Sequence, residues 1–188
     1  MTPDALAQAQ EIAAGVLANV TSDHLDLPTP CDNWNVSQLI DHMVGTQHWA
    51  RAVIDSQEPT ETGEGASAGD FNAAFADAAG RNLASFRADG AMERIVDAGF
   101  GEMPAIAQLG LATTDTFAHA WDLATATGQD DDLYADLAVA LLAGAKRTLP
   151  PAFRSEDGSI FKPEQTAPEG ANAARQLAAF LGRTVPGS

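Results

Sequence analysis

The chain has 188 residues, of which 45% are hydrophobic and 19% charged, a composition typical of a soluble globular protein with one sizeable core. Its 26 acidic and 10 basic side chains leave a formal charge of -16, which repels nucleic-acid phosphates and anionic lipid surfaces. A single cysteine excludes an intramolecular disulfide framework, and no apolar run reaches the roughly 18 residues of a membrane span. We therefore expect a cytoplasmic protein that forms one domain over residues 1–188, with no nucleic-acid or membrane partner.

The first half of the chain predicts two helices. Apolar side chains at helical spacing predict the first over residues 3–20. A loop with two prolines follows at 21–33, and a second helix is expected over 35–55, where Asn35 is its cap. Residues 56–69 hold acids, glycines and small polar side chains without periodicity, which predicts a mobile connection.

The second half continues the helical pattern. A third helix is predicted over 70–87, a short extended segment over 94–96 and a fourth helix over 104–128. A strongly apolar helix follows at 133–149, stopped by two prolines, and a last short helix at 169–181. The sequence therefore predicts an all-α fold, an up-and-down four-helix bundle with additional short helices.

Two histidines and an aspartate are candidates for a metal site. Asp115 and His119 lie four residues apart in the predicted fourth helix, so both side chains project from one face and can hold one ion. His42, in the second helix, would supply a third ligand if the two helices are neighbours, because packed helix axes lie about 8 to 10 Å apart. The residues predict a site with two histidines and one carboxylate.

Three protein ligands leave coordination positions open for water or substrate, the arrangement of a catalytic metal. Zinc is our first choice, and iron, nickel and manganese also accept imidazole and carboxylate ligands. Asp122 extends the stripe of Asp115 by seven residues, and we expect it to orient a ligand or a bound water without binding the ion.

The same residues have simpler interpretations. An aspartate and a histidine four residues apart also form partly solvated pairs that need no metal. His48 lies six residues after His42, on another face of the helix, and His24 lies in the first loop. We interpret His24 and His48 as ordinary surface or packing side chains.

Cys31 and the tryptophans are also ambiguous. Cys31 could be a reactive thiol, but it has no basic neighbour in the sequence and Asp32 would raise its pKa, which favours a packing role. Trp34, Trp49 and Trp121 are interpreted as core or loop anchors, and Trp121 alone could also border a cavity.

Three segments resemble one known family. Residues 29–36 (TPCDNWNV), followed by Leu39 and His42, resemble a signature of the mycothiol-dependent maleylpyruvate isomerase N-terminal family, part of the DinB-like metal-binding superfamily. Residues 119–124 (HAWDLA) and the ATG that ends at Gly128 resemble its second signature. The LGR at 181–183 is similar to the family's tail.

The resemblance implies a DinB-like four-helix bundle with a divalent metal, usually zinc, held by His42, Asp115 and His119. The family pattern has Glu where this chain has Asp115, whose carboxylate is one methylene shorter, so weaker binding and a bridging water are both open. The isomerase itself resembles a bundle with an additional C-terminal domain, for which too few residues follow here.

Two functions remain open from the sequence. The first is a metal-dependent transferase or isomerase that combines a low-molecular-weight thiol such as mycothiol with a small electrophile, because a cation-bound thiol loses its proton near neutral pH. The second is a non-catalytic bundle that binds a small hydrophobic molecule or a protein partner. Asp122 or a metal-bound water could transfer protons, but the sequence identifies no catalytic residue. Whether bundle faces form a homodimer is also open.

Overall fold

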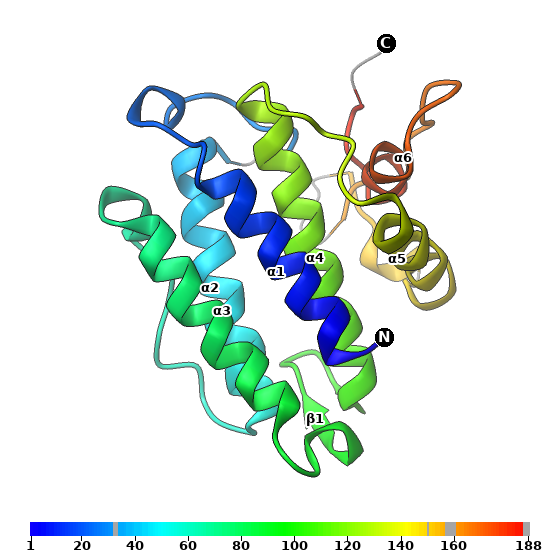
Figure 1. Ribbon diagram of the computed structural model, residues 1–188. Coiled ribbons are helices and arrows are strands. Elements are labelled where there is room, and N and C mark those ends of the chain that lie inside the picture. Colours follow the sequence, from blue (N-terminus) through cyan, green and yellow to red (C-terminus); the bar gives the residue numbers. More distant parts are fainter. Residues whose placement is uncertain (32–33, 150, 157–160, 186–188) are drawn as a thin grey trace.

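Four long helices form a bundle in the computed structural model, which describes residues 1–31, 34–149, 151–156 and 161–185 (Figure 1). They are α1 (Pro3–Leu17), α2 (Val36–Ile54), α3 (Phe71–Arg87) and α4 (Ala105–Ala126). Helices α1 and α2 each pack against both α3 and α4. The all-α bundle predicted from the sequence is confirmed.

The order of the helices requires one long connection. Helices α1 and α4 run in one direction and α2 and α3 in the other (Figure 1), so the chain goes up, down, down and up. Ser85, near the end of α3, accordingly donates a hydrogen bond of 2.8 Å to Asp55, which follows the end of α2. Because α2 and α3 are parallel neighbours, residues 56–69 return along the length of the bundle, a crossover that some four-helix bundles use in place of a short turn.

Local capping explains where several helices begin and end. Asn35 is the cap of α2, as predicted, and forms a capping box with Gln38, in which each side chain accepts a hydrogen bond from the backbone N–H of the other. Helix α1 ends at Leu17, earlier than predicted. The last helix, α6 (Ala173–Phe180), begins later than predicted because Asn172 is its cap and accepts a hydrogen bond of 2.8 Å from the backbone of Arg175.

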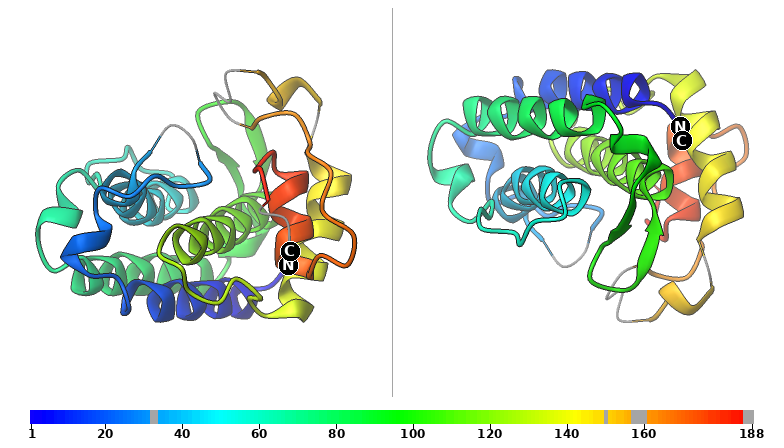
Figure 2. Two further views of the ribbon diagram at one scale, coloured as in Figure 1. Left: turned by 90° about the horizontal axis from the view of Figure 1, so that it is seen from above. Right: turned by 90° about the horizontal axis from the view of Figure 1, so that it is seen from below.

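Two further helices lie at one side of the bundle and a short hairpin at one end (Figure 2). Helix α5 (Ala135–Thr148) packs with α6 against α4. The predicted extended segment corresponds to β1 (Ile95–Asp97), which forms an antiparallel hairpin with an unpredicted partner, β2 (Glu102–Pro104). Short 3₁₀ helices occur at Ser22–His24, Ala66–Ala68, Ala91–Glu93 and Pro151–Phe153. Pro150, the predicted stop of α5, lies outside the described residues.

A buried polar layer crosses the centre of the bundle. Gln47 of α2 accepts hydrogen bonds of 2.9 Å from Gln10 of α1 and Asn82 of α3, and it donates one of 2.9 Å to Thr116 of α4. Each helix thus contributes one member, and unpaired amides in this apolar interior would be costly. The layer therefore fixes the register of α2 against α4, and Thr116 directly follows Asp115.

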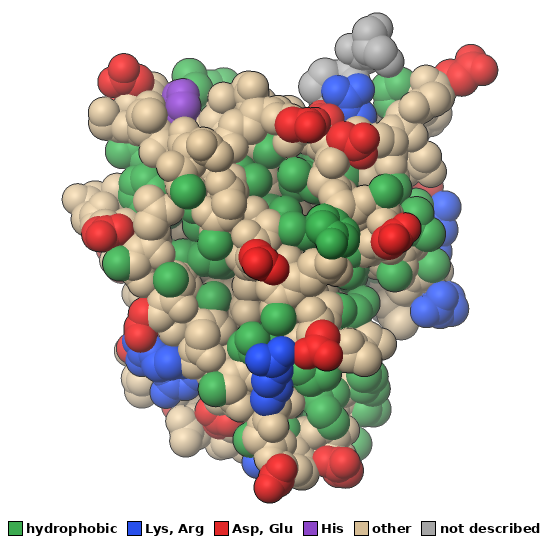
Figure 3. All heavy atoms as spheres, viewed as in Figure 1, with side chains coloured by type: hydrophobic (Ala, Val, Ile, Leu, Met, Phe, Trp, Pro, Cys, Tyr) green, Lys and Arg blue, Asp and Glu red, His purple; other side chains and the backbone are tan. Residues whose placement is uncertain are grey.

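The surface carries the acidity seen in the composition. Acidic side chains are spread over the face drawn in Figure 3, and that face has no continuous basic patch. Among the described residues, no helix combines the length and the apolarity needed to cross a bilayer.

Candidate metal centre

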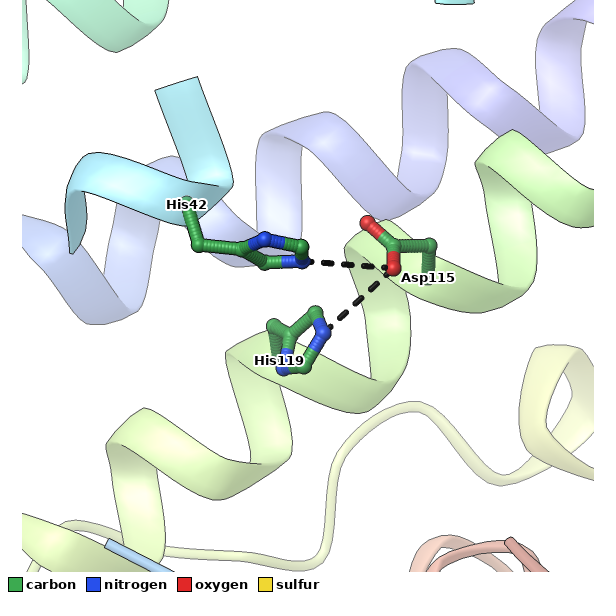
Figure 4. A group of neighbouring side chains, drawn as sticks. All are labelled: His42, Asp115 and His119. Atoms are coloured by element: carbon green, nitrogen blue, oxygen red, sulfur yellow. Dashed lines mark ion pairs between the residues drawn. The ribbon is translucent and has the colours of Figure 1, made fainter. Parts of the chain in front are cut away.

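Three side chains converge between α2 and α4 (Figure 4). Nε2 of His42 lies 3.6 Å from Oδ1 of Asp115, and Nε2 of His119 lies 3.3 Å from the same oxygen. One ligand atom from each residue lies within 4.8 Å of the other two. The structure thus brings together the three residues named from the sequence.

The local fold explains this convergence. Asp115 and His119 are one helical turn apart on α4, and the antiparallel packing of α2 brings His42 opposite them. The indole of Trp34 stacks on the imidazole of His42, with ring centroids 4.2 Å apart and an angle of 29° between the planes. This stacking restricts the ring of His42 to an orientation that points Nε2 toward Asp115.

The spacing of the three residues fits a divalent cation. Donor atoms bound tetrahedrally at about 2.0–2.1 Å are about 3.3 Å from one another, close to the separations of Asp115 from both histidines. The shorter aspartate side chain therefore reaches both. In the described part of the chain, Nε2 of His42 is buried without a hydrogen-bond partner, as expected of an atom that binds an ion.

Asp122 and Arg183 orient His119. Nδ1 of His119 lies 2.9 Å from Oδ2 of Asp122, and Arg183 donates to both oxygens of the same carboxylate, at 3.0 and 3.2 Å. Asp122 is completely buried and Arg183 is 8% exposed. Because a carboxylate only accepts hydrogen bonds, it keeps the proton on Nδ1 and leaves Nε2 of His119 available as a ligand.

The charges of the site shift the pKa values of its members. Burial lowers the pKa of His119, but Asp115 and Asp122 outweigh it and raise that pKa to about 9. Burial likewise opposes ionisation of Asp115, yet His119 and His42 hold its pKa well below the usual range. The pKa of Asp122 is also lowered, despite its burial, by Arg183 and His119. A metal ion must therefore displace a proton from His119.

Sequence reasoning missed two contributors. It identified Asp122 as an orienting residue but not Arg183, whose only signal was the LGR similarity, and it treated Trp34 solely as an anchor. Arg183 also interacts electrostatically with Cys31, an influence that the residues next to Cys31 in the sequence could not show. Asp32, the other predicted influence on Cys31, lies outside the described residues.

The remaining histidines and Trp121 have structural roles. His24 accepts a hydrogen bond of 3.2 Å from the backbone of Thr21 in a capping box. His48 lies 3.7 Å from a carboxylate oxygen of Glu61. Trp121 is 1% exposed and packs in the core near α5 and α6, as the packing interpretation predicted.

Comparisons with known proteins agree with the fold and the motifs. The chain is similar to Uncharacterized protein MT0763 of Mycobacterium tuberculosis (strain CDC 1551 / Oshkosh) and to Uncharacterized protein Rv0738 of the same species (strain ATCC 25618 / H37Rv). Each is 42% identical over 182 residues, which is 95% of this chain and 95% of the relative. No solved structure matches the chain significantly. Residues 6–124, which include all three candidate ligands, match the family model described as the mycothiol maleylpyruvate isomerase N-terminal domain, and the chain therefore belongs to this family.

Proposed function

We propose that the protein is a divalent-metal-dependent enzyme that transfers a low-molecular-weight thiol to a small electrophile, or isomerises a substrate through such a thiol. The observation that carries the proposal is the cluster of His42, Asp115 and His119 between two helices of the bundle. Three protein ligands leave coordination positions free for substrate. The family description supports mycothiol as the thiol.

We propose zinc as the resident metal, with nickel, iron and manganese as alternatives that accept the same ligands. A divalent cation at this position would lower the pKa of a coordinating thiol, so that the thiolate forms near neutral pH. The chain's own part is to supply a ligand set of two neutral imidazoles and one carboxylate.

Asp122 is proposed as a positioning residue and not as a proton acceptor. Both of its oxygens are engaged, by Arg183 and by His119, and its lowered pKa keeps it ionised. It therefore holds the imidazole of His119 and keeps its charge. Trp34 covers one face of His42 and keeps water from that side of the ligand.

We also propose that residues 1–188 form one domain in the cytoplasm. Helices α5 and α6 share an apolar cluster with α1 and α4, which supports the single domain. The high acidity and the single cysteine support the location.

The test is the metal content of untagged protein, measured by elemental mass spectrometry, together with conjugation of mycothiol to monochlorobimane. About one bound ion per chain is expected, and it should be lost in His42→Ala and His119→Ala but kept in the control His24→Ala. Conjugation should stop in His119→Ala. Protein that stays metal-free after reconstitution with zinc, nickel, iron and manganese would instead support the non-catalytic binding bundle.

A further inference from the structure

An open groove with a volume of about 370 Å³ lies beside His42. Its lining comes from the segment before α2, from α2 itself and from the connection to α3, and it includes Trp34, Asp41, His42, Thr46, Trp49 and Glu64. His42 belongs both to this groove and to the candidate metal centre. A molecule in the groove therefore lies directly beside the metal ligands.

The wall formed by residues 56–69 is held in place. Asp41 accepts hydrogen bonds of 3.1 and 2.7 Å from the backbone N–H groups of Gly65 and Ser67. Gly63 packs so closely on α2 that a Cβ there would overlap the carbonyl group of Asp41. Arg51 bonds Glu61 at 3.1 Å. The connection predicted to be mobile is thus anchored at three points, and it forms an ordered wall of the groove.

The groove combines aromatic surface with negative charge. Trp34 and Trp49 supply the two indoles, and Asp41 and Glu64 supply two carboxylates, whereas no lysine or arginine lines it. Within the described residues, no cation forms an ion pair with Glu64. Arg51, the nearest arginine along α2, is engaged by Glu61 and Asp55.

We propose that this groove binds a small molecule that has a flat apolar face and no negative charge, and that it discriminates against anions. Indole faces attract apolar rings and cations, and two carboxylates that pair with no cation among the described residues repel an anion. The identification of this molecule as the electrophilic substrate rests on the proposed function. The binding of such a molecule to the groove is independent of the proposed function.

The test uses three probes of nearly equal size, namely benzylammonium, benzyl alcohol and benzoate. Their affinities are measured by ligand-observed NMR at low ionic strength, in metal-free and in zinc-treated protein. In metal-free protein we expect benzoate to bind about tenfold more weakly than benzylammonium, with benzyl alcohol between them. Added salt should reduce this ratio.

Substitutions inside and outside the groove test whether its own side chains cause the preference against anions. Glu64→Gln should reduce the ratio about threefold, and Thr46→Lys should bring benzoate to the affinity of benzyl alcohol or above it. Glu102→Gln, which removes an exposed carboxylate from the distant hairpin, is the matched control and should change nothing. Trp49→Phe should retain binding of the uncharged probe, and Trp49→Ala should lose it.

Equal affinities for the three probes, absence of binding, or a charge preference unaffected by Glu64→Gln and Thr46→Lys would overturn the proposal. Because the metal-free protein gives the decisive readout, this outcome is independent of whether the cluster binds a metal. A protein that binds zinc but fails this test would keep the proposed function and lose only the assigned groove.

Discussion

Replacing Arg183 by methionine tests whether the buried ion pair supports the site. Asp122 is completely buried, and without Arg183 its remaining partner among the described residues is Nδ1 of His119. Breaking a buried pair costs about 3–5 kcal/mol, because the remaining charge stays out of water. In metal-free protein at pH 7, His119 is protonated, since its pKa is raised to about 9, and it still faces Asp122. We therefore expect a loss in unfolding free energy at the low end, about 3 kcal/mol.

The assay is urea unfolding of metal-free protein at pH 7, followed by circular dichroism. The matched control is Arg175→Met on α6, which breaks the pair between Arg175 and Asp131, whose side chains are 26% and 12% exposed. This pair is partly solvated and should contribute at most about 1 kcal/mol. Zinc affinity, measured by chelator competition, should fall about 10–100-fold in Arg183→Met alone. Equal losses of stability in the two variants, or an unchanged zinc affinity in Arg183→Met, would refute the orienting role.

Three further predictions concern pH, the polar layer and two glycines. Metal-free protein should lose about 3 kcal/mol of unfolding free energy as the pH rises from 6.5 to 9. The pKa of His119 is raised from 6.5 to about 9, so protonation of His119 stabilises the fold fully below pH 6.5 and no longer above about pH 9. The same pH profile in His119→Gln would contradict this. Gln47→Leu removes three buried hydrogen bonds, to Gln10, Asn82 and Thr116, and should cost about 3 kcal/mol in urea unfolding. An unchanged midpoint would contradict the role of the layer. Gly63→Ala should destabilise the fold and speed proteolysis of residues 56–69, because its added methyl group would overlap α2. Gly80→Ala lies on an open helix face and should stabilise the fold by about 0.5–1 kcal/mol. Equal effects of the two substitutions on stability would contradict the close packing of Gly63.

The helices could be predicted because their signals are local. Apolar periodicity and caps such as Asn35 operate within a few residues, and the structure has the helices close to the predicted positions. Within the candidate site, the spacing of Asp115 and His119 fixed their common face, and only His42 required an assumption about which helices are neighbours. That assumption agrees with the packing of α2 on α4.

The residues that the sequence did not reveal depend on contacts between distant segments. Arg183 reaches Asp122 only because α6 docks beside α4, and no spacing rule relates positions so far apart. The wall of the groove was missed for a different reason. Residues 56–69 have the composition of a mobile loop, and their anchors, such as Asp41 on the backbone of Ser67, are single contacts without periodicity.

The position of Arg183 makes the orientation of His119 depend on two separate parts of the chain. The segment that matches the family, residues 6–124, contains both His119 and Asp122, whereas Arg183 lies 61 residues after Asp122 and follows α6. Local undocking of α6 would therefore remove the guanidinium from Asp122 while the four bundle helices stay packed on one another. An opening at this side of the molecule would weaken the support of a metal ligand without unfolding the bundle.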